Sequence, residues 1–477
     1  MWWIIPLAAV LIFVAVVIVR TLRFKPKAEV AAQDTTVEFD KQKAVDCLAQ
    51  LVRCKTVSYA DQSLEDEAEF EKLLQLLPKL YPNVYKNCTV EHLADRGLLI
   101  CWKGQQKGDP AVLMAHYDVV PVSEDGWQKP AFEGIVEDGV LWGRGTLDTK
   151  VTLNSTLFAA DHLIAKGFVP KNDIYLAFSG GEEINGNGAK NIVDWFEKEG
   201  IIPALVLDEG GAVVENVFPG VSKPCGLIGI AEKGLLNACY TVKSAGGHAS
   251  APKPNAPFDR LARACCRVIK HPFKYHITPP VAKLFDTLGR HSTFLYRMIF
   301  ANLWLFAPAL DILCKLTGGE LNALMRTTVA FTQSSGSSVP NVIPPSANMV
   351  SNIRLNPCDT VESALEYLNK TVADPKVEIT ALGGSNPSRI STTDCEGWQR
   401  VATAVASTWR GCIVSPYLMV QCSDSRHYGR ISDKVYRFSS MDLTGEERAS
   451  IHGHNERIRL ETLHRSVEFY IRLIEQC

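Results

Sequence analysis

The sequence lacks the patterns that mark several large enzyme classes. It contains no G-x-S-x-G nucleophile elbow and no H-E-x-x-H helix, which argues against a Ser-based α/β hydrolase and a zincin protease. It has no Walker loop, and no G-x-G-x-x-G opens a helix after a strand, so nucleotide-binding folds are not indicated either. Any catalytic chemistry must therefore come from residues outside these motifs.

The sequence also has no large excess of positive or negative charge, and its cysteines form no recognisable motif. The 50 basic and 52 acidic residues nearly balance, and no basic run is present, which excludes nucleic acid as a partner. The 14 cysteines form no C-x-x-C pair and no zinc-finger spacing. We expect most of them to be buried as small apolar residues, although a Cys412–Cys422 bond stays open.

A long apolar run begins the chain. Residues 2–19 carry no charge and are about long enough to span a bilayer. No Lys or Arg precedes the run and no clear A-x-A cleavage site follows it, which favours a retained single-pass anchor over a cleaved signal and secretion. The basic residues after it would place the body in the cytoplasm by the positive-inside rule, but the side of the membrane is left open. They are Arg20, Arg23, Lys25 and Lys27.

Strand-like and helix-like segments alternate between residues 111 and 211. This alternation predicts an α/β fold with a largely parallel sheet sandwiched by helices. The expected strands are 111–118, 173–183 and 203–211, and the expected helices are 38–54, 152–167, 189–200 and 461–475.

The pattern changes after about residue 234 to strands with polar alternation, which predicts a smaller inserted α+β domain. We expect an anchor at 1–20, a linker at 21–37, a catalytic domain formed by 38–233 and 386–477, and the inserted domain at 234–385. The apolar stretch 281–326 lies within it, and a pair of buried helices is its favoured interpretation. The alternatives are an apolar wall for a greasy substrate and a surface lying on a membrane.

Three predicted strands end in metal-binding side chains. The first ends at His116, the second is followed by Glu182 and Glu183, and the third ends at Asp208. Because sites in open α/β sheets form outside the carboxyl ends of the strands, we expect these residues to converge. Two further segments, "GRGTLDTK" with Asp148 and "IHGHNE" with His452, add a carboxylate and an imidazole.

Imidazoles and carboxylates without a thiolate suit zinc, with manganese or cobalt as alternatives. Five ligands are too many for one ion, but they can hold two ions if one carboxylate bridges. Two metals roughly 3.5–4 Å apart can share an attacking hydroxide and polarise a carbonyl. One Glu of the Glu182–Glu183 pair then stays free as general base, and Asp118 can fix the tautomer of His116.

The sequence resembles the aminoacylase/carboxypeptidase S family of co-catalytic metallopeptidases. The resemblance rests on the order and spacing of "HYDVVP", "LWGRGTLDTK", "GGEEINGNGA", "LDEGG", "GGHASAP", "VPNVIPPSA" and "HGHNE". The stretch "ANLWLFAPALD", with "LNALMRTT" after it, further resembles the branch that holds the N-fatty-acyl-amino-acid synthase/hydrolases. The resemblance implies a zinc-exopeptidase-like fold with a lid or dimerisation domain, and it allows a homodimer through that domain.

The resemblance also implies a role for each matching residue. His116 and Asp208 would hold one metal, Glu183 and His452 the other, and Asp148 would bridge them. Glu182 would be the general base, Asp118 would orient the site, His248 would stabilise the oxyanion, and Asn341 and Arg354 would bind substrate. In dimeric members the histidine at this position reaches the partner's site, so the action of His248 in cis or in trans stays open.

The chain departs from the family pattern at three positions. Thr149 stands where many relatives have a second acidic residue. Glu209 is adjacent to Asp208, and His454 lies two residues after His452; in both cases family spacing favours the first residue. The function expected from this set is metal-dependent hydrolysis, or reversible formation, of N-acyl amino acids. The alternatives are a carboxypeptidase or dipeptidase for short peptides and, less favoured, an inactive binding protein for acyl amino acids.

Overall fold

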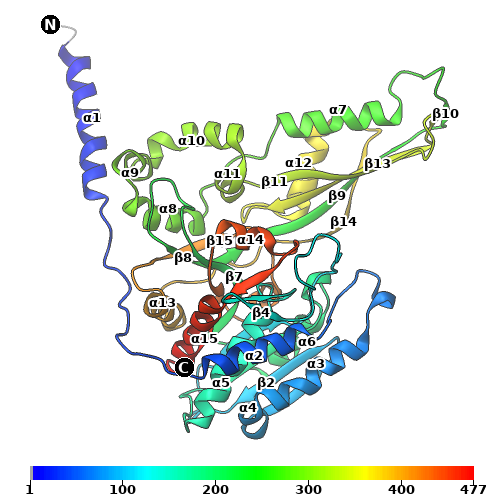
Figure 1. The fold of residues 1–477 in the computed structure, drawn as a ribbon. Helices are drawn as coiled ribbons and strands as arrows, with labels where there is room; N and C mark the ends of the chain where they lie inside the picture. The colour runs from blue at the N-terminus through cyan, green and yellow to red at the C-terminus, as the bar shows by residue number, and fades with distance from the viewer. Residues whose placement is uncertain (1–3) are drawn as a thin grey trace.

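The core of the fold is an eight-stranded sheet that is parallel at its centre. The computed structural model describes residues 4–477, and Figure 1 shows the sheet below the upper layer of helices. The strand order is β1-β2-β6-β3-β7-β16-β8-β15, and β6, β3, β7 and β16 run parallel to one another. Its strands are β1 (Thr89–Leu93), β2 (Gly97–Trp102), β3 (Ala111–His116), β6 (Ile174–Ser179), β7 (Leu205–Val214), β8 (Cys225–Glu232), β15 (Ile413–Met419) and β16 (Val435–Leu443).

Helices cover both faces of this sheet, which explains why β2, β3 and β6 are buried along their whole length. The helix α6 (Gly188–Glu199) packs on one face and shares a core with alternate residues of β2, β3 and β6. The other face is covered by α2 (Lys41–Val52), α3 (Glu67–Leu80), α4 (Pro82–Asn87), α5 (Lys150–Ala165), α13 (Glu396–Thr408) and α15 (Leu460–Ile474). The predicted α/β sandwich is therefore confirmed, and the expected helices and strands lie within a few residues of their predicted bounds.

A second sheet lies within residues 234–385. It has the order β11-β13-β9-β14 and is antiparallel throughout. Its own apolar core lies between the strands and two helices, separate from the core of the first sheet. The elements are β9 (Gly234–Lys243), α7 (Pro257–Lys270), β11 (Thr328–Ser335), β13 (Ser346–Leu355), α12 (Val361–Val372) and β14 (Glu378–Ser385).

The apolar stretch 281–326 differs from its favoured prediction of two buried helices. It forms four short helices, and many of its large side chains are exposed. The helices are separated at Ser292, Asn302 and Gly318, and α9 and α10 are bent by 110°, so one buried stripe cannot continue through all four. The inner side chains pack on β15 and the core of the first sheet. The helices are α8 (Pro279–His291), α9 (Phe294–Ala301), α10 (Leu303–Thr317) and α11 (Gly319–Met325).

An apolar helix, α1 (Ile4–Arg23), stands at the edge of the molecule beside these helices (Figure 1). It is long and apolar enough to cross a bilayer, as a signal sequence would be, and the predicted anchor begins in residues 1–3, outside the described part. Residues 24–40, which form neither helix nor strand, then lead past α13 and α15 to α2. The remaining elements are η1 (Gln62–Leu64), β4 (Ile135–Glu137), β5 (Val140–Trp142), η2 (Glu182–Ile184), β10 (Gly247–His248), β12 (Val342–Ile343), η3 (Asp424–Arg430), α14 (Gly445–Ser450) and β17 (Arg457–Arg459). All 14 cysteines, including Cys412 and Cys422, are free.

Candidate active site

The candidate site lies where β3, β6 and β7 end. His116 is the last residue of β3, Glu182 and Glu183 form the short helix η2 after β6, and β7 contains Asp208 and Glu209. Asp148 comes from the loop before α5, and His452 follows α14. Sheet topology thus gathers residues that are more than 300 positions apart in the sequence.

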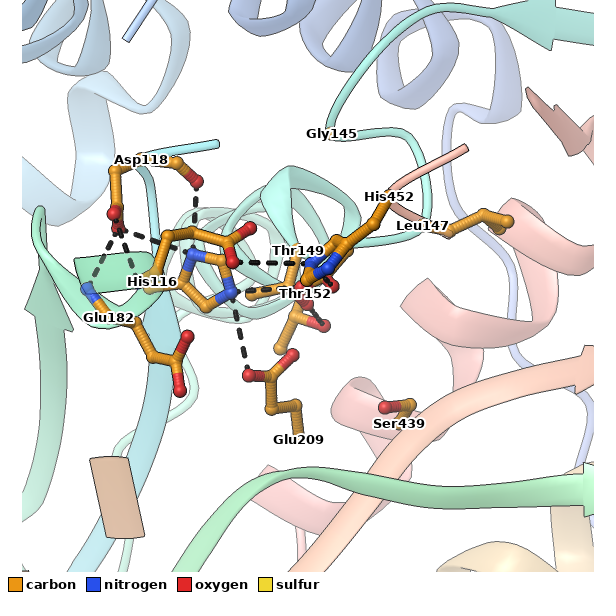
Figure 2. Close-up of polar contacts among 12 residues, drawn as sticks. His116, Asp118, Gly145, Leu147, Thr149, Thr152, Glu182, Glu209, Ser439 and His452 are labelled. Carbon is orange, nitrogen blue, oxygen red and sulfur yellow. Dashed lines mark hydrogen bonds and ion pairs between the residues drawn. The ribbon is translucent and has the colours of Figure 1, made fainter. Parts of the chain in front are cut away.

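His116 is the central residue of this cluster. Its Nε2 atom lies 2.9 Å from Asp148 Oδ1 and 3.4 Å from Glu209 Oε1, while Nδ1 lies 3.3 Å from Asp118 Oδ1. Figure 2 shows Asp118 and Glu209 on different sides of the imidazole ring, each joined to it by a dashed line. The side chain is buried, so its ring is held with Nε2 facing the two carboxylates.

Asp148 lies between the two histidines. Its Oδ1 atom faces His116, and its Oδ2 atom lies 3.0 Å from His452 Nε2. The same His452 nitrogen lies 3.2 Å from Glu183 Oε2. One carboxylate therefore contacts both imidazoles through different oxygens, which is the arrangement a bridging ligand needs. Thr149, next to it, donates its hydroxyl to Thr152 at 2.7 Å.

Asp118 is buried and holds both sides of the site together. Its Oδ1 atom accepts the backbone N–H of Glu182, and its Oδ2 atom accepts that of Glu183, both at 3.2 Å. The same carboxylate faces Nδ1 of His116, whose position is also fixed by the Asp118 carbonyl at 3.0 Å. A carboxylate behind a ligating histidine orients the ring and fixes its tautomer.

The predicted ligand Asp208 does not reach the histidines. Its side chain is buried and accepts the backbone N–H of Ser425 at 2.9 Å. In the pairing of β7 with β16, Asp208 and Gly211 oppose consecutive residues, so Glu209 and Gly210 bulge out of the ladder. The bulge directs the Glu209 side chain to His116, and Glu209 is the carboxylate of this pair that lines the cavity.

Glu456 is a residue of this region that the sequence did not single out. It is fully buried, and its Oε1 atom accepts the backbone N–H groups of Gly145, Leu147 and Asp148 at 3.0, 2.7 and 3.2 Å. Its Oε2 atom accepts from Arg144 at 2.6 Å. Glu456 therefore shapes the loop that presents Asp148. The available signal was its place in "HGHNE", four residues after His452.

The electrostatics of the cluster follow from an excess of carboxylates. Burial alone would lower the pKa of His116, but Glu209 and the hydrogen bonds of nearby carboxylates raise it well above its usual value. Hydrogen bonds with Asp148 and Glu183 raise the pKa of His452 to about 10. Burial raises the pKa of Glu209 to about 8, with a contribution from the charge of Asp148, and burial raises that of Glu182 well above its usual range. The cluster thus favours positive charge at its centre.

The donor set fits divalent metal ions. Ligand atoms of His116, Asp148 and Glu183 lie within 4.8 Å of one another, and so do those of His116, Glu182 and Glu209. The Oε1 atom of Glu183 is buried and has no hydrogen-bond partner among the described residues. Imidazole and carboxylate donors suit zinc, manganese or cobalt.

A cavity of about 630 Å³ opens from the cluster. One part of its wall consists of polar site residues, and another consists of apolar side chains from α8 and α11. The polar part includes Asp148, Glu182, Glu183, Glu209 and His452, and the apolar part includes Leu284, Leu288, Leu321 and Leu324.

The predicted oxyanion residue His248 and the predicted substrate-binding residues Asn341 and Arg354 lie in two places. Arg354, on β13, donates to the sulfur of Cys422 at 3.4 Å, and Cys422 lines the cavity. His248 and Asn341 lie together at the tip of the second sheet, where the Asn341 carbonyl accepts the N–H of Ala249. Both are exposed, and neither lines the cavity. Figure 1 shows β10, which contains His248, far from β7 and α14.

Comparison with known proteins agrees with this geometry. Residues 112–476 match the family model described as peptidase family M20/M25/M40. The chain is 32% identical to the probable carboxypeptidase S-like 2 of Dictyostelium discoideum over 96% of its length and 91% of that protein. It is also 32% identical to the N-fatty-acyl-amino acid synthase/hydrolase of Xenopus tropicalis, over 98% and 93% of the two chains. The fold matches an M20 family metallo-carboxypeptidase of Sulfolobus solfataricus with a TM-score of 0.66 at 17% identity, covering 91% and 98%.

Proposed function

Because the chain belongs to peptidase family M20/M25/M40, whose members are metal-dependent hydrolases, we propose that it cleaves the amide bond of N-acyl amino acids with long acyl chains. The observation that carries this proposal is the cavity, which joins the carboxylate–histidine cluster to the apolar side chains of α8 and α11. An apolar wall at that place suits a long acyl chain, which is apolar along its whole length. The same enzyme could form the amide when fatty acid and amino acid are both abundant.

We propose two zinc ions as cofactors, with manganese or cobalt as alternatives. His116 and Glu209 would hold one ion, Glu183 and His452 the other, and Asp148 would bridge them. Glu209 replaces Asp208 in this set because Glu209 faces His116. When bound, the ions supply Lewis acidity, which lowers the pKa of a water molecule and polarises the carbonyl of the substrate.

Glu182 is the proposed general base. It lines the cavity beside the ligands, and Asp118 fixes its backbone position without engaging its carboxylate. Its raised pKa suits a group that takes a proton from the attacking water and returns it to the leaving nitrogen. Arg354, which contacts the cavity-lining Cys422, would pair with the carboxylate of the amino acid, because a guanidinium binds a carboxylate through two parallel hydrogen bonds.

The experiment is a substrate panel of N-acyl amino acids with acyl chains of increasing length, together with dipeptides, read by mass spectrometry with and without a chelator. We expect kcat/KM to rise with chain length and activity to disappear with chelator. Glu182→Gln should lower kcat by roughly 100-fold to 10,000-fold while metal content stays unchanged. Exposed Glu199→Gln is the matched control.

A carboxypeptidase or dipeptidase activity is the second candidate. Its support is the equal identity to the probable carboxypeptidase of Dictyostelium discoideum. Rapid cleavage of dipeptides with no dependence on acyl length would replace the first proposal by this one. Metal binding without turnover of any substrate would instead favour a binding protein.

A further inference from the structure

The helices α9 and α10 expose an unusual number of large apolar side chains. Together they form a bent pair. Several of their large apolar side chains stay exposed to solvent in the described part of the chain. Proteins in water rarely leave such contiguous patches uncovered. The exposed residues are Phe294, Leu295, Tyr296, Trp304, Ile312, Leu313 and Leu316, which are 40–80% exposed.

This surface, called here the α9–α10 surface, is continuous with α1. The ring of Trp304 packs edge-on against Phe13, with centroids 5.9 Å apart. Asn302, at the bend, donates to the carbonyl of Val17 at 3.3 Å and accepts from Arg20 at 3.1 Å. Figure 1 shows α9 beside the carboxyl-terminal half of α1. A bilayer that surrounds α1 would therefore meet the α9–α10 surface at the same level.

Charge and aromatic residues mark the same boundary. Arg23 ends α1, Lys25 and Lys27 follow it, and all three are exposed. Lys27 pairs with Asp286 of α8 at 2.7 Å, which ties this basic segment to the helices below the surface. Basic residues beside an apolar helix bind anionic headgroups, and Trp and Tyr favour the interface of a bilayer.

The neighbouring helices α8 and α11 line the catalytic cavity. Leu284 and Leu288 of α8 and Leu321 and Leu324 of α11 line its apolar wall. Within the segment α8–α11, the helices α8 and α11 therefore carry apolar side chains toward the cavity, and α9 and α10 carry apolar side chains toward the outside.

We propose that the α9–α10 surface docks into the leaflet at the carboxyl end of α1 and that acyl chains reach the cavity from that leaflet along α8 and α11. The occupant is a phospholipid bilayer and not a second copy of the chain, because the surface continues onto α1. The route for acyl chains rests on the proposed function, whereas the docking does not.

Docking is tested on the full-length protein in vesicles of phosphatidylcholine and phosphatidylserine that contain a diazirine-labelled phosphatidylcholine. After illumination, lipid adducts are located by peptide mass spectrometry. We expect adducts on residues 294–316 as well as on α1. The matched control is α7, whose Phe258 and Ile269 are 44% and 68% exposed on the other domain. Adducts confined to α1, or equally frequent on α7, overturn the docking.

The route is tested with Leu295→Asp combined with Leu316→Asp, and Ile269→Asp as control. For a long-chain N-acyl amino acid presented in vesicles, we expect the double variant to lose kcat/KM by roughly tenfold, since two apolar contacts with the leaflet are lost. For a soluble N-acetyl amino acid we expect no change.

The two proposals fail in different ways. Equal rates of wild type and double variant on the long-chain substrate, or an equal loss on both substrates, overturn the route. A wild type that hydrolyses neither substrate counts against the proposed function, and the photolabelling still decides the docking. If the double variant does not fold, the photolabelling of the wild type remains decisive.

Discussion

Adjacent residues on β7 face opposite environments, and this difference gives a prediction for Glu209. Glu209 lies 3.4 Å from His116, whereas Asp208 accepts an N–H from Ser425. We expect Glu209→Gln to weaken binding of one of two ions by roughly 100-fold or more, since losing even an outer partner of a ligand costs about 10–100-fold. Titration with zinc, followed by mass spectrometry of bound metal, measures the change.

Asp208→Asn is the matched control for that change. The amide oxygen can still accept from Ser425, so we expect two ions to bind with nearly unchanged affinity. Loss of an ion in Asp208→Asn, with retention in Glu209→Gln, would restore Asp208 as the ligand.

The sequence predicted which strand ends contribute to the cluster, and the choice of Asp208 or Glu209 as ligand stays a prediction. His116, Asp148, Glu183 and His452 do gather as the strand ends suggested, because parallel strands end at one edge of a sheet. The choice of Asp208 depended on spacing, and spacing does not reveal a bulge. The pairing shift between β7 and β16 is a tertiary feature, and no local signal in "LDEGG" separates the two acids.

The buried Glu456 anchors the loop from Gly145 to Asp148, and Glu456→Gln tests the importance of this anchor. The change removes the charge opposite Arg144, whose side chain is only 3% exposed. Breaking a buried pair destabilises a fold by about 3–5 kcal/mol, so we expect a clearly lower thermal midpoint and weaker metal binding. Both are measurable in detergent micelles by scanning calorimetry and zinc titration.

An exposed pair provides the control for this element. Glu446 pairs with Arg457, but its side chain is 79% exposed. Surface pairs contribute about 0–1 kcal/mol, so Glu446→Gln should leave both quantities nearly unchanged. Equal behaviour of the two variants would show that Glu456 does not organise the loop.

The short helix η3 contains His427, which predicts a loss of stability in acid. Burial, together with Arg426 and Arg430, lowers the pKa of His427 from 6.5 to about 4. Between these values the unfolded chain binds more protons than the folded chain, so the free energy of unfolding falls as the pH drops from 6.5 to 4. One pKa unit corresponds to about 1.4 kcal/mol, which limits this contribution to about 3.5 kcal/mol.

His427→Gln should remove this part of the acid sensitivity. We expect the thermal midpoint of the variant to fall less steeply than that of the wild type between pH 6.5 and pH 4. His92→Gln, at an exposed position on β1, should retain the wild-type slope. If the thermal midpoints of all three proteins fell with the same slope, His427 would be excluded as a cause of the acid sensitivity.

At the scale of elements, periodicity predicted the first sheet and its helices but not the apolar stretch 281–326. The buried strands read as continuous apolar runs, and their flanking helices have one apolar face. In α9 and α10 apolar side chains occur on several faces of the helix. The amphipathic pattern, which assumes a polar face toward water and an apolar face toward the core, therefore does not predict which side chains are buried. If lipid is the outer solvent, exposed leucines carry no penalty.

At the scale of the whole molecule, the sequence predicted the alternation that builds the first sheet, but it did not predict how far the second sheet carries His248 from the cavity. Distance between domains depends on strand length, twist and docking, none of which a motif records. The motif "GGHAS" identified the residue, and the structure of one chain leaves it exposed and outside the cavity.

The exposed tip of the second sheet therefore predicts that His248 acts in the site of a partner copy. His248→Ala and Glu182→Gln should each be inactive alone. When both variants are co-expressed and pair at random, half of the dimers are mixed, and one of the two sites in each mixed dimer has an intact Glu182 and a partner with an intact His248. We therefore expect about one quarter of wild-type activity for a twofold-symmetric dimer. Purified mixed dimers, selected by two different affinity tags, should show about one half of wild-type activity, because one of their two sites is intact. No recovery would mean that His248 serves its own chain, through a movement of the second sheet toward β7.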